Sequence, residues 1–341
     1  MEQNILQVKD LHVSYYTYAG EVQSVRGVSF YVKKGETLAI VGESGCGKSV
    51  TAKSIMRLIA DPGKIKDGSS IVFDGRDVLA MRKRELRSYR GDDCAMIFQD
   101  ALTSLDPTMK VGKQIAEVLK IHGKANGKRA AAQAVELLRQ VGIPNPERRA
   151  QEYPHQFSGG MRQRAMIATA LACSPKLLIA DEPTTALDVT IQAQIIDLMK
   201  QLQQQTGTAI ILITHDLGVV ADIAQRICVM YSGKIVECGS ARDIFYRPRH
   251  PYTLALLSSV PRLDLKNKQE LVTIDGTPPD LLQPPAGCPF CTRCKYCMPI
   301  CRDEMPAETD FGSGHLAACW LHDARAPSVD APLYDEKETE K

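Results

Sequence analysis

A glycine-rich segment that ends in a lysine and a serine has the composition of a phosphate-binding loop. It fits the pattern G-x-x-x-x-G-K-[ST] with Gly42, Glu43, Ser44, Gly45, Cys46, Gly47, Lys48 and Ser49. Glycines let the backbone turn tightly, so that successive amide N–H groups can face one anion. Lys48 can then reach the β- and γ-phosphates of a nucleotide, and the Ser49 hydroxyl can ligate Mg²⁺. The segment therefore predicts a nucleotide-phosphate site.

The elements expected around this loop support the same interpretation. Leu38 to Val41 is a short apolar run typical of a buried strand, and Lys48 to Ala60 can form a helix. The first turn of that helix adds unpaired N–H groups and the positive end of its dipole. The alternative is a glycine-rich turn followed by a chance Lys-Ser pair, and the strand–loop–helix context argues against it.

A second candidate position lies at the end of the apolar run from 177 to 180, which is followed by Asp181 and Glu182. A carboxylate at the end of such a strand can hold Mg²⁺ through its water shell. The next residue, Glu182, can act as a general base toward a water that attacks the γ-phosphate. Strands often end in acidic residues that form turns, so this pair alone is weak evidence. Together with the phosphate-binding loop at Gly42 it indicates a nucleotide-hydrolysing site.

Two further strands end in polar residues that can contribute to the same site. Gln99 follows the strand 94–98, and His215 follows the strand 209–214. In a parallel α/β sheet, ligands bind at the carboxyl ends of the strands, so both side chains are expected at one crevice. Either residue alone is more simply explained as a satisfied buried polar group, but their joint placement favours a site.

A second glycine-containing segment is expected to begin a helix. Ser158, Gly159 and Gly160 precede a helical pattern that runs to Cys173. Bare N–H groups at such a helix start suit a phosphate, and the alternative is a simple cap by Ser158.

Bulk composition limits the class of protein. The chain has 341 residues, of which 44% are hydrophobic and 24% charged, with a net charge of +2. This balance is typical of a globular protein of more than one average domain and gives no electrostatic argument for binding nucleic acid. No apolar run approaches the ~20 residues of a membrane-spanning helix. The first residues lack a signal-peptide layout, so we expect a cytosolic protein with reduced cysteines.

Strands that alternate with helices predict an α/β fold with a mostly parallel sheet. We expect a nucleotide-binding domain over residues 1–250, with a helical subdomain at about 107–165, and a cysteine-rich extension over 251–341. The expected strands are 6–16, 24–32, 38–41, 71–73, 94–98, 176–180, 209–214 and the hairpin 226–238. The expected helices are 48–60, 82–89, 111–121, 128–141, 159–173 and 191–205.

The order of these motifs resembles that of ABC ATPase subunits, a P-loop NTPase family, over roughly residues 5–320. Three segments resemble the dipeptide and oligopeptide importer branch: 152–161, 180–188 and 249–253. The signature of this chain differs from the commonest L-S-G-G-Q at both ends, with Phe157 and Met161. The residues expected to touch phosphate are unchanged.

The resemblance implies that two ATPase subunits enclose two ATP molecules, so that Ser158, Gly159 and Gly160 face the nucleotide on the partner's loop. It also implies that Gln99 senses Mg²⁺ and the attacking water, and that His215 contacts the γ-phosphate and positions Glu182. Asp188 would contact the partner subunit. An aromatic residue near the N-terminus would stack on adenine: Tyr15 is our choice, with Tyr16 and Tyr18 as alternatives.

The expected partners are a second homologous ATPase, two membrane permease subunits and an extracytoplasmic substrate-binding protein. They would hold the chain at the cytoplasmic face of the membrane, where it powers the import of peptides. Nickel or sugars are alternative cargo by resemblance, and pairing with an identical chain is an alternative to the heterodimer. Two alternative functions come from a different class of protein. One is a soluble ABC ATPase of translation or DNA repair, and the other is a redox regulator that uses ATP as a switch. The first of these usually has two nucleotide domains or a long coiled coil, which this sequence lacks.

Six of the eleven cysteines crowd between Cys288 and Cys319. Cys291, Cys294, Cys297 and Cys301 have the ferredoxin spacing of a [4Fe–4S] cluster, although Arg302 stands where such runs have proline. The importer resemblance implies a different set, which we favour: Cys288, Cys294, Cys301 and Cys319. Zinc is the alternative metal, because it also accepts four thiolates.

Overall fold

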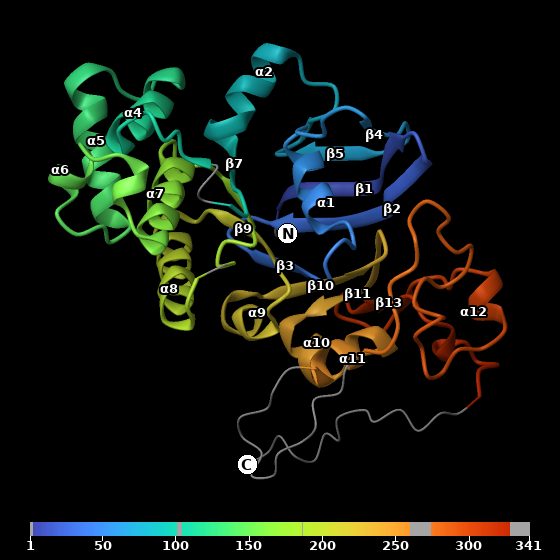
Figure 1. The fold of residues 1–341 in the computed structure, drawn as a ribbon. Coiled ribbons are helices and arrows are strands. Elements are labelled where there is room, and N and C mark those ends of the chain that lie inside the picture. The colour runs from blue at the N-terminus through green and yellow to red at the C-terminus, as the bar shows by residue number, and fades with distance from the viewer. Residues whose placement is uncertain (1–2, 101–103, 186, 260–273, 328–341) are drawn as a thin grey trace, which may run out of the picture.

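Two β-sheets, a group of helices at one side and a C-terminal region at the other make up the fold (Figure 1). The structure is a computed structural model that describes residues 3–100, 104–185, 187–259 and 274–327. Within these ranges, none of the helices combines the length and apolar character needed to cross a bilayer.

The first sheet is antiparallel, in the order β2-β1-β5-β6, with β4 also paired to β1. Its strands are β1 (Asn4–Thr17), β2 (Gly20–Lys33), β4 (Gly63–Ile65), β5 (Ser70–Phe73) and β6 (Arg76–Asp77). The expected strands at 6–16 and 24–32 are therefore longer than predicted and form one hairpin. That they belong to a separate sheet was not predicted, because strand pairing has no local signal in the sequence.

The second sheet has the order β12-β13-β11-β10-β3-β9-β8-β7. Its strands are β3 (Thr37–Val41), β7 (Cys94–Ile97), β8 (Leu177–Asp181), β9 (Ala209–Thr214), β10 (Arg226–Tyr231), β11 (Lys234–Ser240), β12 (Thr309–Asp310) and β13 (Leu316–Ala317). The run from β10 to β7 is parallel, as the sequence predicts, and every residue of β3, β8 and β9 is buried. Burial on both faces explains why these strands are continuous apolar runs.

α-Helices and short helical turns surround the two sheets. The described helices are α1 (Lys48–Ile55), α2 (Lys83–Ser88), α4 (Val111–Ile121), α5 (Gly127–Gln140), α6 (Pro146–Arg149), α7 (Gly159–Leu171), α8 (Val189–Thr206), α9 (Leu217–Ile223), α10 (Ala241–Tyr246), α11 (Pro251–Ser258) and α12 (Ile300–Asp303). Short helical turns occur at η1 (Tyr89–Asp93), η2 (Pro154–Gln156) and η3 (Trp320–His322). Helices α4 to α7 form the helical layer at the left of Figure 1, next to α8.

The helical layer shares one apolar core with the second sheet. Ile115, Ala134, Leu138 and Ala165 are completely buried in this core, which also contains Ile97 of β7 and Leu178 of β8. Helix α4 has the predicted bounds, and α5 begins and ends one residue earlier than predicted. A polar contact also joins this layer to the turn before β7: Asp92 accepts from His122 at 3.2 Å and pairs with Lys124 at 3.1 Å.

Helix α1 is shorter than the predicted 48–60. Arg57 has a φ of 50°, in the left-handed region that ends a helix. Its guanidinium donates to the carbonyl oxygen of Met81 at 2.7 Å, so the chain is fastened to a neighbouring loop there. The helix ends in a local backbone motif: the Arg57 amide donates to the carbonyl oxygen of Ser54, and the Leu58 amide donates to that of Lys53.

The C-terminal region has an apolar core that includes aromatic residues of the preceding chain. Phe290 is 2% exposed and packs in a cluster with Tyr231, Tyr252 and several cysteines. Strand β13 also pairs with β11, where Ala317 lies opposite Glu237. Contacts therefore cross the boundary predicted at residue 250, and the division into two domains stays a prediction.

Candidate functional site

The loop after β3 can be built only with glycine at two of its positions. Gly42 has a φ of 153°, and a Cβ there would lie 2.1 Å from the carbonyl oxygen of Met230. Gly47 has a φ of 104°, and its Cβ would lie 2.5 Å from the carbonyl oxygen of Ser24. At Gly45, by contrast, a Cβ would meet no atom within 4 Å. The loop is thus pressed against β10 and β2 on one side and open at Gly45.

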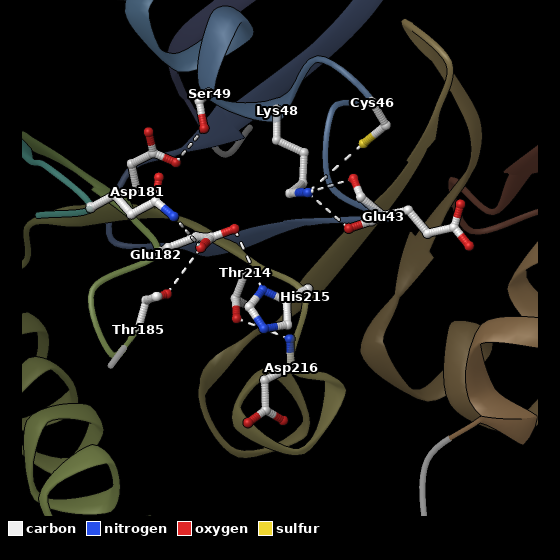
Figure 2. A network of polar contacts seen from close by, with 12 residues as sticks. Glu43, Cys46, Lys48, Ser49, Asp181, Glu182, Thr185, Thr214, His215 and Asp216 are labelled. Atoms are coloured by element: carbon white, nitrogen blue, oxygen red, sulfur yellow. Dashed lines mark hydrogen bonds and ion pairs between the residues drawn. The ribbon is translucent and has the colours of Figure 1, made fainter. Parts of the chain in front are cut away.

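Lys48 and Ser49 begin α1; the Lys48 side chain turns back to the loop, and the Ser49 side chain points to Asp181 (Figure 2). The Lys48 ammonium donates to the carbonyl oxygens of Gly42 and Glu43, at 2.8 and 2.9 Å. The Ser49 hydroxyl donates to Oδ1 of Asp181 at 2.8 Å. Of the three residues predicted to contact Mg²⁺, Ser49 and Asp181 therefore lie together, and the third, Gln99, donates to Glu182.

Asp181 ends β8 almost completely buried. Burial raises the pKa of its carboxyl group and the charge of Glu182 adds to this rise, whereas the hydrogen bond from Ser49 and the charges of Lys53 and Lys48 lower it. A buried carboxylate gains most from a nearby cation, which is the environment that suits a divalent metal ion.

Glu182 is the centre of the polar network drawn in Figure 2. Its carboxylate accepts from Nε2 of Gln99 at 2.8 Å and from the Thr185 hydroxyl at 2.9 Å, and lies 3.4 Å from Nδ1 of His215. Its φ is 48°, unusual for a residue other than glycine, and its amide donates to the carbonyl oxygen of Ile213. A strained backbone held by a neighbouring strand aims this carboxylate, and strain of this kind is concentrated at functional sites.

The predicted signature residues lie on the helical layer, at the start of α7. The Ser158 hydroxyl accepts from the Met161 amide at 3.3 Å, so Ser158 forms the helix cap that was the alternative interpretation of this segment. Ser158 and Asp188, which caps α8, are both exposed. A Cβ at Gly160 would lie 2.8 Å from Ile191, so the two helix starts are packed side by side. Ala186, part of the motif that ends in Asp188, lies outside the described residues.

Tyr15 lies on β1 with its ring partly buried. It packs on the apolar cluster beneath α1, and burial raises the pKa of its hydroxyl. Tyr16 and Tyr18 are 46% and 114% exposed, and Lys64 lies over the Tyr16 ring. The adenine-stacking role stays a prediction for Tyr15, with the two exposed tyrosines as alternatives.

Sequence reasoning missed the partners of Glu43. The Glu43 amide donates to the Tyr252 hydroxyl at 2.9 Å, and its carboxylate pairs with Arg293 at 2.6 and 3.0 Å. Thr185, which holds Glu182, was also missed. Arg293 is distant in sequence and its neighbourhood suggested only a metal site, so no local signal connected it to the phosphate loop.

The cysteine-rich segment encloses a small cavity of about 10 Å³. The lining includes Cys288, Cys291, Cys294, Cys301 and Cys319, with His250 at the same cavity. His250 is 1% exposed, and its Nδ1 accepts from the Tyr252 amide, so Nε2 carries the proton of the neutral ring. Among the described residues this Nε2 has no hydrogen-bond partner. A buried N–H group without an acceptor, next to several thiols, fits a site that binds a cofactor with sulfur or other hydrogen-bond acceptor atoms.

Local amides favour the thiolate form of three of these cysteines. Burial raises the pKa of Cys288 and Cys319 to about 12 and that of Cys294 to about 11. In each case the amide two residues later, in Phe290, Leu321 and Tyr296 respectively, acts in the opposite direction by hydrogen bonding to the sulfur. Thiols in such surroundings stay protonated unless a metal takes their charge.

The separation of the sulfurs bears on the kind of metal. Within the described ranges, no three of these cysteine sulfurs all lie within 4.8 Å of one another. Zn–S bonds of about 2.3 Å would place tetrahedral sulfurs about 3.8 Å apart. Asp92, His122 and Cys173 do satisfy the 4.8 Å limit, but the Lys124 ammonium already neutralises Asp92.

Comparisons with known proteins agree with this geometry. Residues 25–185 match the ABC transporter family, and residues 236–301 match the C-terminal region of oligopeptide/dipeptide transporters.

Two curated relatives come from Bacillus subtilis. The dipeptide transport ATP-binding protein DppD is 56% identical over 95% of this chain and 96% of its own length. The oligopeptide transport ATP-binding protein OppD is 56% identical over 96% of this chain and 92% of its own length. Among solved structures, a dimeric post-hydrolysis state of the ATP-binding cassette MJ0796 bound to ADP and Pi has a TM-score of 0.63. It is 28% identical and covers 70% of this chain and 99% of that one.

Replacement of Lys48 tests the phosphate loop directly. We expect Lys48→Ala to weaken the binding of MgATP at least about 100-fold, because no other ammonium group contacts the loop carbonyls in the described chain. Isothermal titration calorimetry measures this change. The control is Lys128→Ala, at the exposed start of α5. Equal affinity of Lys48→Ala and the control would contradict the assignment.

Proposed function

The chain belongs to the ABC transporter family, and from that membership we propose that it is the ATP-hydrolysing subunit of an importer for dipeptides and oligopeptides. The observation that carries the proposal is the convergence of Ser49, Asp181 and Glu182 at the carboxyl ends of neighbouring parallel strands. The match of residues 236–301 to the C-terminal region of oligopeptide and dipeptide transporters supports the peptide cargo over nickel or sugars.

Each residue of the site has a distinct task in hydrolysis. The loop amides and Lys48 bind the β- and γ-phosphates, and Ser49 and Asp181 hold Mg²⁺, which neutralises charge on the triphosphate. Glu182 accepts a proton from the water that attacks the γ-phosphorus, so that the bond to the β-γ bridging oxygen breaks and ADP and phosphate form. Gln99, Thr185 and His215 keep the Glu182 carboxylate oriented, because each contacts one of its oxygens.

The second half of each nucleotide site is supplied by another subunit. Ser158 and Asp188 are exposed on the helical layer, with Gly159 and Gly160 beside them, and α7 lies apart from α1 in Figure 1. A helix start that presents free N–H groups to solvent can contact a γ-phosphate held by a partner. The similarity to a cassette that is dimeric with ADP and Pi supports this arrangement. We favour a homologous second ATPase over an identical chain.

Transport then follows from the different affinity of ATP for the closed and open dimer. Two membrane permease subunits would receive this motion through the region after Gln99 and the helical layer. They would also hold the chain at the cytoplasmic face of the membrane, and a binding protein outside would deliver the peptide.

The C-terminal cysteines are proposed to hold a [4Fe–4S] cluster through Cys288, Cys294, Cys301 and Cys319. The amide hydrogen bonds to Cys288 and Cys319, the two cysteines that this set does not share with the ferredoxin spacing, support it.

If Glu182 is the general base, its replacement should slow the hydrolysis of ATP without preventing the binding of MgATP. Glu182→Gln should bind MgATP within about threefold of the wild type but hydrolyse it at least about 100-fold more slowly, because an amide cannot accept the proton. Phosphate release and calorimetry measure the two quantities, and size-exclusion chromatography with ATP should show a trapped dimer. Glu136→Gln, on the exposed face of α5, is the control. Unchanged turnover in Glu182→Gln would refute the role.

Reconstitution tests the transport function. The membrane subunits that co-purify with this chain are placed in vesicles with it, its partner ATPase and a binding protein. We expect ATP-dependent uptake of a labelled dipeptide or oligopeptide, absent with Glu182→Gln. Nickel and a maltodextrin are offered in parallel, and uptake of either without uptake of peptide would overturn the peptide assignment.

Metal analysis distinguishes the ligand sets. Protein purified without oxygen should contain about four iron and four sulfide per chain. Single serine replacements at Cys288, Cys294, Cys301 or Cys319 should remove most of both, and Cys291→Ser or Cys297→Ser should retain them. Zinc without sulfide would exclude the cluster. Loss of iron on replacing Cys291 and Cys297, with retention on replacing Cys288 and Cys319, would indicate the ferredoxin-type set.

A further inference from the structure

The phosphate-binding loop contains an acidic residue close to where a polyanion is bound. Glu43 follows Gly42, and its side chain is 26% exposed. A carboxylate in such a loop repels phosphate unless its charge is compensated. In Figure 2 its carboxylate is turned away from the Lys48 ammonium, toward the C-terminal region.

Arg293 compensates this charge with a fully occupied guanidinium group. Nη1 donates to Oε2 of Glu43 at 2.6 Å and to the Tyr231 hydroxyl at 3.1 Å, and Nη2 donates to Oε1 at 3.0 Å. Nη2 also donates to the carbonyl oxygen of Ile274, and Nε to that of Asp275. All five N–H donors of the side chain therefore have acceptors, and the side chain is 4% exposed.

The surroundings of Arg293 are rigid on both sides. Tyr231, Tyr252 and Phe290 pack against one another, with ring centroids 4.5 to 5.3 Å apart. Tyr252 also accepts the amide proton of Glu43, so the aromatic cluster holds the backbone of the residue whose side chain Arg293 holds. Arg293 directly precedes Cys294, one of the cysteines at the cavity.

We propose that Arg293 is a positioning residue for the phosphate-binding loop: it neutralises Glu43 and fixes its side chain, so that the loop can accept a nucleoside triphosphate. The cysteine-rich segment thereby reaches into the nucleotide site of its own chain. This inference rests on the proposed function in so far as ATP binds at Gly42 to Ser49.

The test is a double-mutant cycle on the affinity for MgATP, measured by calorimetry on full-length protein with its metal retained. Arg293→Ala leaves the Glu43 charge uncompensated and should weaken binding about tenfold. Lys295→Ala removes a positive charge from the same turn at an exposed position and should change the affinity less than twofold. Glu43→Gln alone completes the cycle: it removes the negative charge of the loop and keeps one oxygen acceptor for Arg293, and its affinity is the reference for the double variant.

The combination Arg293→Ala/Glu43→Gln is decisive. Removing the repelling charge should restore most of the affinity lost in Arg293→Ala, which a general loss of structure would not allow. The inference is overturned if Arg293→Ala binds MgATP with the affinity of the wild type. It is also overturned if the double variant has the same reduced affinity as Arg293→Ala. Should Arg293→Ala lose iron or its thermal transition, Arg293→Gln replaces it, and the same restoration is required. Failure of the wild type itself to bind MgATP would instead refute the proposed function.

Discussion

The shared register of three parallel strands is the constraint on which the nucleotide site depends. Val41 at the end of β3 lies opposite Thr214 of β9, and Asp181 at the end of β8 lies opposite Ile213. The phosphate loop, the acidic pair and His215 therefore begin at one edge of one sheet, although they are far apart in sequence. All three strands are buried on both faces, so a shift in register would draw charged residues at their ends, such as Asp181, into the apolar core, where burial of a charge is costly.

This constraint explains which parts of the structure could be predicted. Motifs at strand ends, such as Gln99, Glu182 and His215, were brought together correctly because a parallel sheet leaves them little choice. The separate sheet that contains the β1–β2 hairpin depends on contacts between distant segments, since β1 also pairs with β4 and β5. The role of Arg293 could not be predicted for the same reason, since only tertiary packing brings it next to Glu43.

The C-terminal region is bound to the nucleotide site by more than sheet pairing. Tyr252 and Arg293 hold opposite sides of Glu43, one through its amide and the other through its carboxylate. Farther along, Leu281 accepts from the Gln23 amide and Pro285 from Arg26, so the same segment lies against β2. The cysteine-rich segment thus contacts both the phosphate-binding loop, at Glu43, and strand β2. A structural change in this segment can therefore reach the phosphate-binding loop through direct contacts.

The pairing of β11 with β13 has a consequence for how the chain is made. Synthesis completes β11 at Ser240, but its neighbour at Leu316 emerges from the ribosome only much later. During that interval β11 is an open edge, with unpaired N–H and C=O groups that can join a strand of another nascent chain. The later pairing with β13 closes this edge, so the C-terminal region also protects the sheet of the nucleotide site from edge-to-edge association.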